Sequence, residues 1–363
     1  MRARVQAIFR AMKKPVSVVA LSNSTEPHID LSFFYATGLT DGLFEGCSAF
    51  LRRDGRSLVL SSALEEESAR KGRDPVRVFR RRDQRQDLMR KALAGARTVG
   101  VNASEITHRA FSELRRLAPR RAKFVDVSEA ITRARMVKDE GEVRLIRRAC
   151  VIASEAFEEV APEIRAGTRE SEVAADLVRA MQRRGASGPS FRTIVGSGPN
   201  GAEPHYTAGS RKLRRGDLVV IDFGAAYHMY VSDITRTITV GRASARQKEI
   251  HETVRHAQDA ATATLREGRI GKEVDTAARS VIDASPWKGR FIHGLGHTIG
   301  LAVHDGGGLN QASDVVLGRG MVFTNEPGIY VRGYGGVRIE DDLLVTGGRP
   351  RFLTTATREL LEV

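Results

Sequence analysis

The segment from Asp217 to Val240, DLVVIDFGAAYHMYVSDITRTITV, contains two apolar β-rich runs joined by a short turn, a pattern that predicts a buried β-hairpin. With the turn centred between Tyr227 and His228, Asp222 faces Asp233 directly across the hairpin. Directly opposed residues place their Cβ atoms about 4.5–5.5 Å apart. Two carboxylates held this close repel each other unless a cation or a proton lies between them. The pair therefore indicates a site for a cation.

A second segment repeats the arrangement. From Thr324 to Val345 the sequence reads TNEPGIYVRGYGGVRIEDDLLV, and a turn about Gly333 pairs Glu326 with Glu340. The Pro327-Gly328 step is a place where a bulge would shift this register. Two hairpins that each supply a carboxylate pair offer enough hard oxygen donors to bridge two divalent cations roughly 3.5–4 Å apart.

Between the two hairpins lies a run of histidines and glycines, FIHGLGHTIGLAVHDGGG, with His293, His297 and His304. One imidazole can complete a site for two cations, and the glycines let backbone and substrate approach closely. Taken alone, a strand Asp is usually a surface or turn group, and a His in an apolar setting is usually a core residue. The joint occurrence of carboxylate pairs around a Gly-His run favours the metal site.

The order of patterns along the chain predicts two domains. At 363 residues the chain exceeds the size at which one hydrophobic core usually stops growing. Short strand-like runs alternate with helical patterns up to about residue 130, which predicts a modest α/β layer. A boundary is expected within residues 127–138. Beyond it we expect helices followed by Gly-rich strand segments, with the helices at Asp139–Ala161, after an N-cap at Thr168, at Ala243–Glu267 and at Val274–Ala284.

Composition adds little to this reading. The formal net charge is +14 and the pI is about 10.3, which in isolation points toward nucleic acid or an anionic membrane. The Arg residues form short separate clusters, such as residues 80–82, without interleaved aromatics, so a solvated surface is favoured over an anionic partner. No apolar run approaches the roughly 20 residues of a membrane span, and the N-terminus lacks a signal-peptide core. A cytoplasmic location is expected.

At these motifs the sequence resembles the pita-bread metallopeptidases, which include methionine aminopeptidase, aminopeptidase P and prolidase. The resemblance covers roughly residues 130–363. IDFGA and SDITRT place Asp222 and Asp233 at the family's first two metal-ligand positions, HGLGH places His297 at its histidine ligand, and NEPGIY and GVRIED place Glu326 and Glu340 at the remaining two.

Further residues carry over by the same resemblance. His205 in NGAEPHY and His304 in VHD match two histidines on the substrate side, His293 matches a neighbouring active-site histidine, and Arg338 matches a group behind the ligands. VHD, rather than the VHE of methionine aminopeptidases, is similar to prolidases and aminopeptidases P. FFYATGL and MVKDEGEVRLIRRAC resemble the creatinase-type domain and interdomain helix of the proline-specific members, which also favours cleavage at Xaa-Pro bonds.

The resemblance implies an α+β fold. A C-terminal pita-bread (creatinase/aminopeptidase) catalytic domain with pseudo-twofold symmetry, residues 131–363, would follow a smaller α/β creatinase-like N-terminal domain, residues 1–130. It further implies a homodimer and a peptide substrate with proline at the second position. The implied chemistry is attack by a hydroxide that bridges two divalent cations, expected to be manganese, with cobalt or zinc as alternatives. Glu326 is the implied proton shuttle, and His205 and His304 would hold the substrate carbonyl.

Several alternatives stay open at this point. The motifs do not separate prolidase from aminopeptidase P. A non-catalytic pita-bread module that binds protein or nucleic acid is the alternative function, supported only by the positive charge. Creatine hydrolysis on the same fold does not use the metal cluster, so the intact ligand set argues against it. His228, His251 and His256 are assigned to a hairpin turn and an exposed helix, without a catalytic role.

Overall fold

The computed structural model describes residues 1–363, and its chain folds as two units, Met1–Arg135 and Met136–Val363. This division falls at the end of helix α6 (Ser128–Met136). The domain boundary predicted after residue 130 stays a prediction. No helix has both the length and the apolar character that crossing a membrane requires.

The first unit contains a mixed six-stranded sheet in the order β4-β3-β2-β1-β5-β6. Strands β1, β5 and β6 run parallel, β2 pairs antiparallel with both β1 and β3, and β3 runs parallel to β4. This agrees with the α/β layer predicted for this part of the chain. The strands are β1 (Val18–Ser22), β2 (Ser48–Leu51), β3 (Ser57–Ser62), β4 (Val76–Phe79), β5 (Thr98–Val101) and β6 (Lys123–Asp126).

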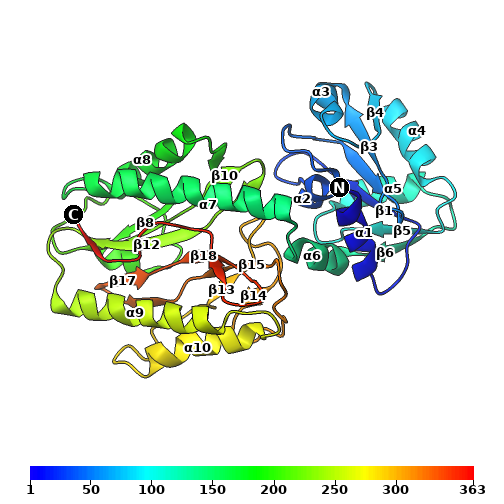
Figure 1. The fold of residues 1–363 in the computed structure, drawn as a ribbon. Coiled ribbons are helices and arrows are strands. Elements are labelled where there is room, and N and C mark those ends of the chain that lie inside the picture. Colours follow the sequence, from blue (N-terminus) through cyan, green and yellow to red (C-terminus); the bar gives the residue numbers. More distant parts are fainter. The chain divides into compact units, whose positions relative to one another are not determined.

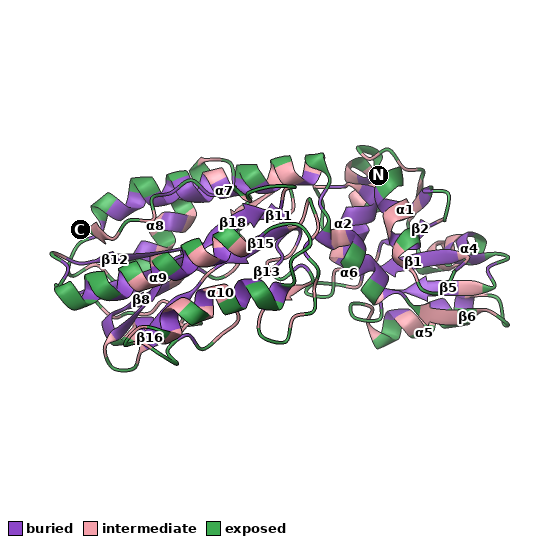
Figure 2. Cartoon of the chain, turned by 60° about the horizontal axis from the view of Figure 1, so that its bottom comes forward, coloured by how far each residue is buried: buried purple, intermediate pink, exposed green.

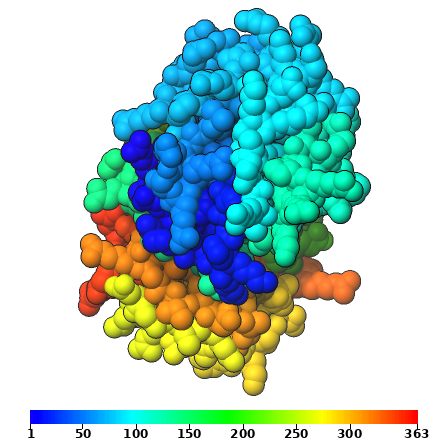
Figure 3. Space-filling view, turned by 90° about the vertical axis from the view of Figure 1, so that its right-hand side faces the viewer, coloured from blue at the N-terminus to red at the C-terminus, as the bar shows by residue number.

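Helices pack around this sheet and share its apolar core. Met89 and Leu93 of one helix and Leu114 of another are fully buried against Val99 of β5. In Figure 3 the side chains of this unit, coloured from blue to cyan-green, form a closely packed surface. Besides α6, its helices are α1 (Arg2–Ala11), α2 (Leu31–Thr37), α3 (Glu66–Arg70), α4 (Arg82–Leu93) and α5 (His108–Leu117), with a 3₁₀ turn at Ala63–Glu65.

The first half of the second unit is a helix pair with two small, mainly antiparallel sheets. Asp139 caps α7 (Glu140–Val160) by accepting from the amide of Glu142, whose side chain accepts in return from the amide of Asp139. The predicted N-cap at Thr168 is wrong: α8 (Glu170–Arg183) begins one residue later, and the Arg169 amide donates to Glu172 Oε2. The strands that follow are β7 (Gly188–Pro189), β8 (Ile194–Ser197), β9 (Leu218–Phe223), β10 (Ala225–Tyr227), β11 (Tyr230–Val231) and β12 (Ile234–Thr239).

The second half repeats this plan with α9 (Ala245–Thr264) and α10 (Gly271–Asp283). Figure 1 shows the two helix pairs on opposite sides of the central strands, and Figure 2 shows those strands buried while the helices keep exposed outer faces. His251 lies on α9 but is buried, which corrects its assignment to an exposed face. The remaining strands are β13 (Gly296–His297), β14 (Gly308–Leu309), β15 (Val322–Asn325), β16 (Gly328–Val331), β17 (Gly335–Arg338), β18 (Asp341–Leu344), β19 (Arg351–Phe352) and β20 (Leu361–Glu362).

The first predicted hairpin register is wrong. Asp222 lies opposite Thr235 rather than Asp233. The turn residues are His228 and Met229, with φ of 47° and 69°, so the turn is centred one residue later than predicted. Positive φ at both central residues is the geometry of a tight two-residue hairpin turn. Asp233 precedes Thr235 by two residues, so it points to the same face as Asp222 from a diagonal position.

The second hairpin has the predicted register. Gly328 pairs with Arg338 in one ladder and Asn325 pairs with Asp341 in the other, as a turn about Gly333 requires. No bulge displaces the strands at Pro327. Glu326 and Glu340 lie between the two ladders, where the strand pairing is interrupted.

Candidate metal centre

A cavity of about 560 Å³ opens in the second unit, with carboxylates and imidazoles on its wall. Its lining contains every residue that the sequence assigned to the site. Apolar side chains of Phe191, Ile194, Pro204 and Val303 complete part of the wall, together with several glycines. The predicted site residues on it are Asp222, Asp233, His297, Glu326, Glu340, His205, His304, His293 and Arg338.

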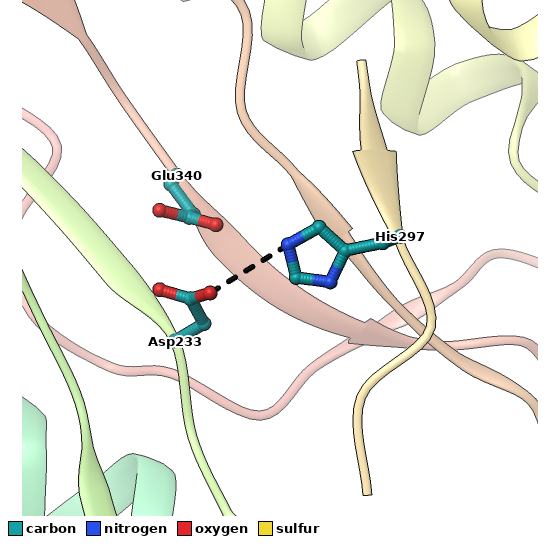
Figure 4. A group of neighbouring side chains, drawn as sticks. All are labelled: Asp233, His297 and Glu340. Atoms are coloured by element: carbon teal, nitrogen blue, oxygen red, sulfur yellow. Dashed lines mark ion pairs between the residues drawn. The ribbon is translucent and has the colours of Figure 1, made fainter. Parts of the chain in front are cut away.

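Three of the predicted ligands form a tight group. Asp233, His297 and Glu340 each offer one ligand atom, and these atoms all lie within 4.8 Å of one another. Figure 4 shows the three side chains converging from separate segments, with His297 Nε2 at 3.7 Å from Asp233 Oδ2. Asp233 stands just before β12, His297 ends β13, and Glu340 joins β17 to β18. Segments far apart in sequence therefore place their polar groups at one point.

Glu326 adjoins this group through the histidine. Its Oε1 lies 3.4 Å from His297 Nε2 and accepts a hydrogen bond from Thr324 Oγ1 at 3.2 Å. Thr324 Oγ1 in turn accepts from the His297 amide at 3.0 Å. The amide of Glu326 donates to the Leu295 carbonyl instead of to β18, so the end of β15 is attached to the histidine segment.

Asp222 is held differently from the other carboxylates. Arg338 Nη2 donates to Asp222 Oδ2 at 2.5 Å, and both side chains are almost fully buried. Arg338 also donates to Tyr330 Oη at 2.9 Å and to Thr235 Oγ1 at 2.9 Å. His293 Nε2 lies 2.8 Å from the same Tyr330 hydroxyl. Arg338 and Tyr330 thus connect the predicted ligand Asp222 to His293, the predicted neighbouring active-site histidine.

The donor set fits divalent cations. Asp222 Oδ1, Asp233 Oδ1 and Glu340 Oε1 are buried and have no hydrogen-bond partner, although buried carboxylate oxygens normally have one. Burial first, and then the charges of Glu340 and Asp222, raises the pKa of Asp233 well above its ordinary value. Burial first, and then Glu326 and Asp222, does the same to Glu340. A cation among these oxygens supplies the missing partner and removes the repulsion.

The Glu326–His297 pair behaves in the opposite way. Burial by itself would raise the pKa of Glu326, but the hydrogen bond and charge of His297 lower it below 4.5 overall. Burial disfavours the charged form of His297, yet Glu326 raises its pKa above 6.5. The pair consequently favours an ionised glutamate at neutral pH.

The other two predicted histidines lie at the open side of the cavity. His205 and His304 are both exposed, and the rings of His304 and His297 have centroids 4.1 Å apart. Burial, and then the charge of His297, lowers the pKa of His304. Beside it, Asp305 is buried and lies 3.4 Å from Lys138 Nζ. His304 is thus available to a ligand while its neighbour is anchored.

Sequence reasoning missed two residues of this network. Thr235 donates through Oγ1 to Glu340 Oε2 at 2.6 Å, and Tyr330 connects Arg338 to His293. A signal existed for each. Thr235 follows Asp233 by two residues and so shares its face, and Tyr330 lies diagonally from Arg338 on the same face of the predicted second hairpin.

Carboxylates and an imidazole gathered around a cavity at the centre of a helix-covered sheet are typical of enzymes that use divalent cations for hydrolysis, and this is the class that the fold and site define. The chain belongs to metallopeptidase family M24, which residues 144–347 match. Residues 4–137 match the creatinase/prolidase N-terminal domain. The family and the α+β architecture implied by the sequence motifs are thereby confirmed, and no comparison supports a non-catalytic binding module.

Similar proteins cover nearly the whole chain. An Xaa-Pro dipeptidase of Pyrococcus horikoshii is 37% identical over 361 residues, which is 99% of this chain and 99% of that protein. The crystal structure of the X-Pro aminopeptidase of Thermotoga maritima superposes with a TM-score of 0.90 at 33% identity, covering 96% of this chain and 98% of the other. The prolidase structure from Pyrococcus horikoshii gives a TM-score of 0.88 at 36% identity, covering 99% and 100%.

Proposed function

We propose that this chain is an Xaa-Pro dipeptidase that hydrolyses the amide bond before proline. The observation that carries the proposal is the convergence of Asp233, His297 and Glu340 in the cavity, in a chain that is similar over its full length to an Xaa-Pro dipeptidase. Dipeptides are favoured over longer peptides because this relative, which matches 99% of the chain, is named a dipeptidase.

Asp222, Asp233, His297, Glu326 and Glu340 would hold two divalent cations, with manganese favoured because the set is rich in carboxylate oxygens. Divalent cations in such a site polarise the scissile carbonyl and lower the pKa of a water molecule toward neutrality. The unpartnered oxygens of Asp222, Asp233 and Glu340 support their assignment as ligands. The homodimer remains a proposal that rests on the family resemblance, and the cytoplasmic location likewise remains a proposal.

The chain's own groups would move the proton and hold the substrate. Glu326 is ionised at neutral pH because His297 lowers its pKa, so Oε1 can accept a proton and pass it to the proline nitrogen as the amide bond breaks. His205 and His304 at the open side of the cavity would donate hydrogen bonds to the carbonyl oxygen as negative charge develops on it. The apolar side chains of Phe191, Ile194 and Val303 on the cavity wall would shield the leaving group from water.

The test compares metal content and peptide length. Protein stripped by chelator is restored with manganese, cobalt or zinc and assayed on an Xaa-Pro dipeptide and on a tripeptide that begins with Xaa-Pro. The expected result is metal-dependent hydrolysis of the dipeptide, with manganese most effective and the tripeptide cleaved poorly. Asp233→Asn should abolish turnover. Absence of hydrolysis with every metal would overturn the enzyme proposal, and preference for the tripeptide would assign the chain as an aminopeptidase.

A further inference from the structure

One buried carboxylate outside the metal centre accepts several hydrogen bonds. Glu170, the first residue of α8, is fully buried. Its Oε1 accepts from the Ser197 amide at 2.8 Å, from Ser197 Oγ at 2.6 Å and from Asn200 Nδ2 at 3.0 Å. Its Oε2 accepts from Tyr206 Oη at 2.9 Å and from the Gly209 amide at 3.4 Å. An ionised carboxylate suits this environment because it only accepts.

These donors lie on both sides of His205. Ser197 and Asn200 stand on the limb that leaves β8, while Tyr206 and Gly209 stand on the limb that returns toward α8. His205 is exposed and lines the cavity, so its position depends on the backbone on either side. On one side Tyr206 is bound to Glu170, and on the other the Pro204 carbonyl accepts from Arg338 Nη1 at 3.4 Å.

Backbone bonds fix where the returning limb meets the helix. The Ser171 amide donates to the Gly209 carbonyl at 3.0 Å, and the Glu170 amide donates to the Arg211 carbonyl at 3.1 Å. Arg211 pairs with Asp217 at 2.6 Å and also contacts Ser197 Oγ. These contacts hold the ends of the segment. Between the limbs, Asn200 Nδ2 donates to Tyr206 Oη at 2.8 Å, and both side chains also donate to the Glu170 carboxylate, which orients this direct link.

We propose that Glu170 is a positioning residue for His205: its carboxylate joins residues 197–200 to residues 206–209 and thereby sets where the His205 imidazole stands in the cavity. The inference rests on the proposed function, because it matters for turnover only if His205 acts on the substrate. It requires no contact between Glu170 and the substrate.

Glu170→Gln weakens the link that the carboxylate makes between the two limbs, with little change in volume, and leaves the direct bond from Asn200 to Tyr206 in place. The new amide keeps one acceptor oxygen, which the three donors of Ser197 and Asn200 retain, and presents an N–H₂ group to the Gly209 amide. Two donors then face each other in a partly buried place, so the side-chain link to the Gly209 amide is lost, while the Ser171 amide still holds the Gly209 carbonyl. The Tyr206 hydroxyl can rotate and accept a hydrogen bond from the new amide, but the Gly209 N–H can only donate.

The experiment is a double-mutant cycle on the metal-loaded enzyme with an Xaa-Pro dipeptide. Glu170→Gln is expected to lower kcat/KM by roughly 10-fold, since effective positioning of a group is worth about this much or more. In a His205→Ala background the same substitution should change kcat/KM by less than about twofold, because the group it positions is gone. Glu172→Gln, an exposed carboxylate on the same helix, is the matched control and should stay within about twofold of wild type.

A second readout does not depend on activity. Amide hydrogen exchange of Gly209 in the metal-free protein should speed up in Glu170→Gln and stay unchanged in Glu172→Gln. Should Glu170→Gln fail to fold, Tyr206→Phe removes one donor, keeps the carboxylate and passes through the same cycle. The inference is overturned if Glu170→Gln lowers kcat/KM as much in the His205→Ala background as in wild type. It is also overturned if neither Glu170→Gln nor Tyr206→Phe lowers kcat/KM. Wild-type hydrolysis of the dipeptide tests the proposed function separately.

Discussion

Arg338 Nη2 lies 2.5 Å from Asp222 Oδ2, whereas Asp222 Oδ1 is buried without a partner. One oxygen of this carboxylate is therefore balanced within the protein, and the other is left for a ligand. The same guanidinium reaches Tyr330 and Thr235. Arg338 thus orients a predicted metal ligand and a residue that contacts a second ligand, Glu340.

Replacing Arg338 should harm both stability and turnover. Arg338→Gln leaves Asp222 as a buried carboxylate without its cation, a change that typically costs about 3–5 kcal/mol. Arg338→Lys keeps the charge but cannot form bonds to Asp222, Tyr330 and Thr235 together, so kcat/KM should fall by at least about 100-fold with a smaller loss of stability. Urea unfolding and peptide assays check this. Arg332→Gln, in the exposed turn of the same hairpin, is the control. Equal effects of Arg338→Gln and Arg332→Gln would refute the role of Arg338 in orienting Asp222.

The metal-free protein should lose stability as pH rises. Burial, and then Glu326 and Asp222, raises the pKa of Glu340 well above 4.5, so the folded state binds more protons than the unfolded chain above that pH. Its free energy of unfolding then falls with increasing pH. Metal-free Glu340→Gln should therefore be more stable than metal-free wild type at pH 7 and should show no such gain at pH 4.

Chelated samples unfolded by urea at a series of pH values give this comparison. Restored manganese should stabilise wild type far more than Glu340→Gln. The exposed Glu359→Gln serves as control. A Glu340→Gln variant that is less stable than wild type at pH 7 without metal would show that the buried carboxylates do not oppose folding.

His251 should make the protein acid-sensitive by a separate route. Burial, and then Arg255 and Arg236, lowers its pKa from 6.5 to about 4. The folded state therefore binds fewer protons than the unfolded chain in this range, and stability present above pH 6.5 is lost as pH falls toward 4. Between pH 7 and pH 4, the free energy of unfolding of His251→Leu should therefore fall by up to about 3 kcal/mol less than that of wild type. This figure follows from the pKa shift at about 1.4 kcal/mol per unit. The test is to measure the unfolding of His251→Leu and of the exposed His256→Leu at pH 7 and pH 4. If both variants lose the same stability between these pH values, His251 is not the source of the acid sensitivity.

Asp305 should not tolerate a longer side chain. A Cβ placed on Gly300 would stand 2.1 Å from Asp305 Oδ2, so the carboxylate already touches the backbone, and Lys138 holds it at 3.4 Å. Asp305→Glu adds a methylene where there is no space for it, and should lower the free energy of unfolding by about 1–3 kcal/mol. It should also lower kcat/KM, because a shift of residue 305 would displace the preceding His304. Thermal unfolding and peptide assays check this against the exposed Asp314→Glu. Wild-type stability in Asp305→Glu would show that the segment can adapt.

The two predicted hairpins differ in how well the sequence predicts their strand register. The predicted register around Glu326 and Glu340 is correct, because the turn lies about Gly333 and no bulge at Pro327-Gly328 shifts the strands. The predicted alignment of Asp222 is not, because His228 and Met229 adopt positive φ values that are uncommon outside Gly, Asn and Asp. Side-chain periodicity still placed both aspartates on one face.

Glu170 shows what sequence patterns leave out. Its partners Ser197, Asn200, Tyr206 and Gly209 run from the last residue of β8 through a 3₁₀ turn into a loop, so no single spacing rule relates them to the start of α8. The pairing of Lys138 with Asp305 likewise joins residues 167 positions apart. Contacts of this kind depend on the complete tertiary fold.

The unpartnered oxygens of Asp222, Asp233 and Glu340 have a consequence for the protein's lifetime in its host. A chain that buries like charges folds against their repulsion until cations arrive, and cation binding then adds to its stability by mass action. When trace metal is scarce, a larger fraction of the chains is unfolded and open to proteases. The amount of folded protein would thus follow the supply of divalent cations.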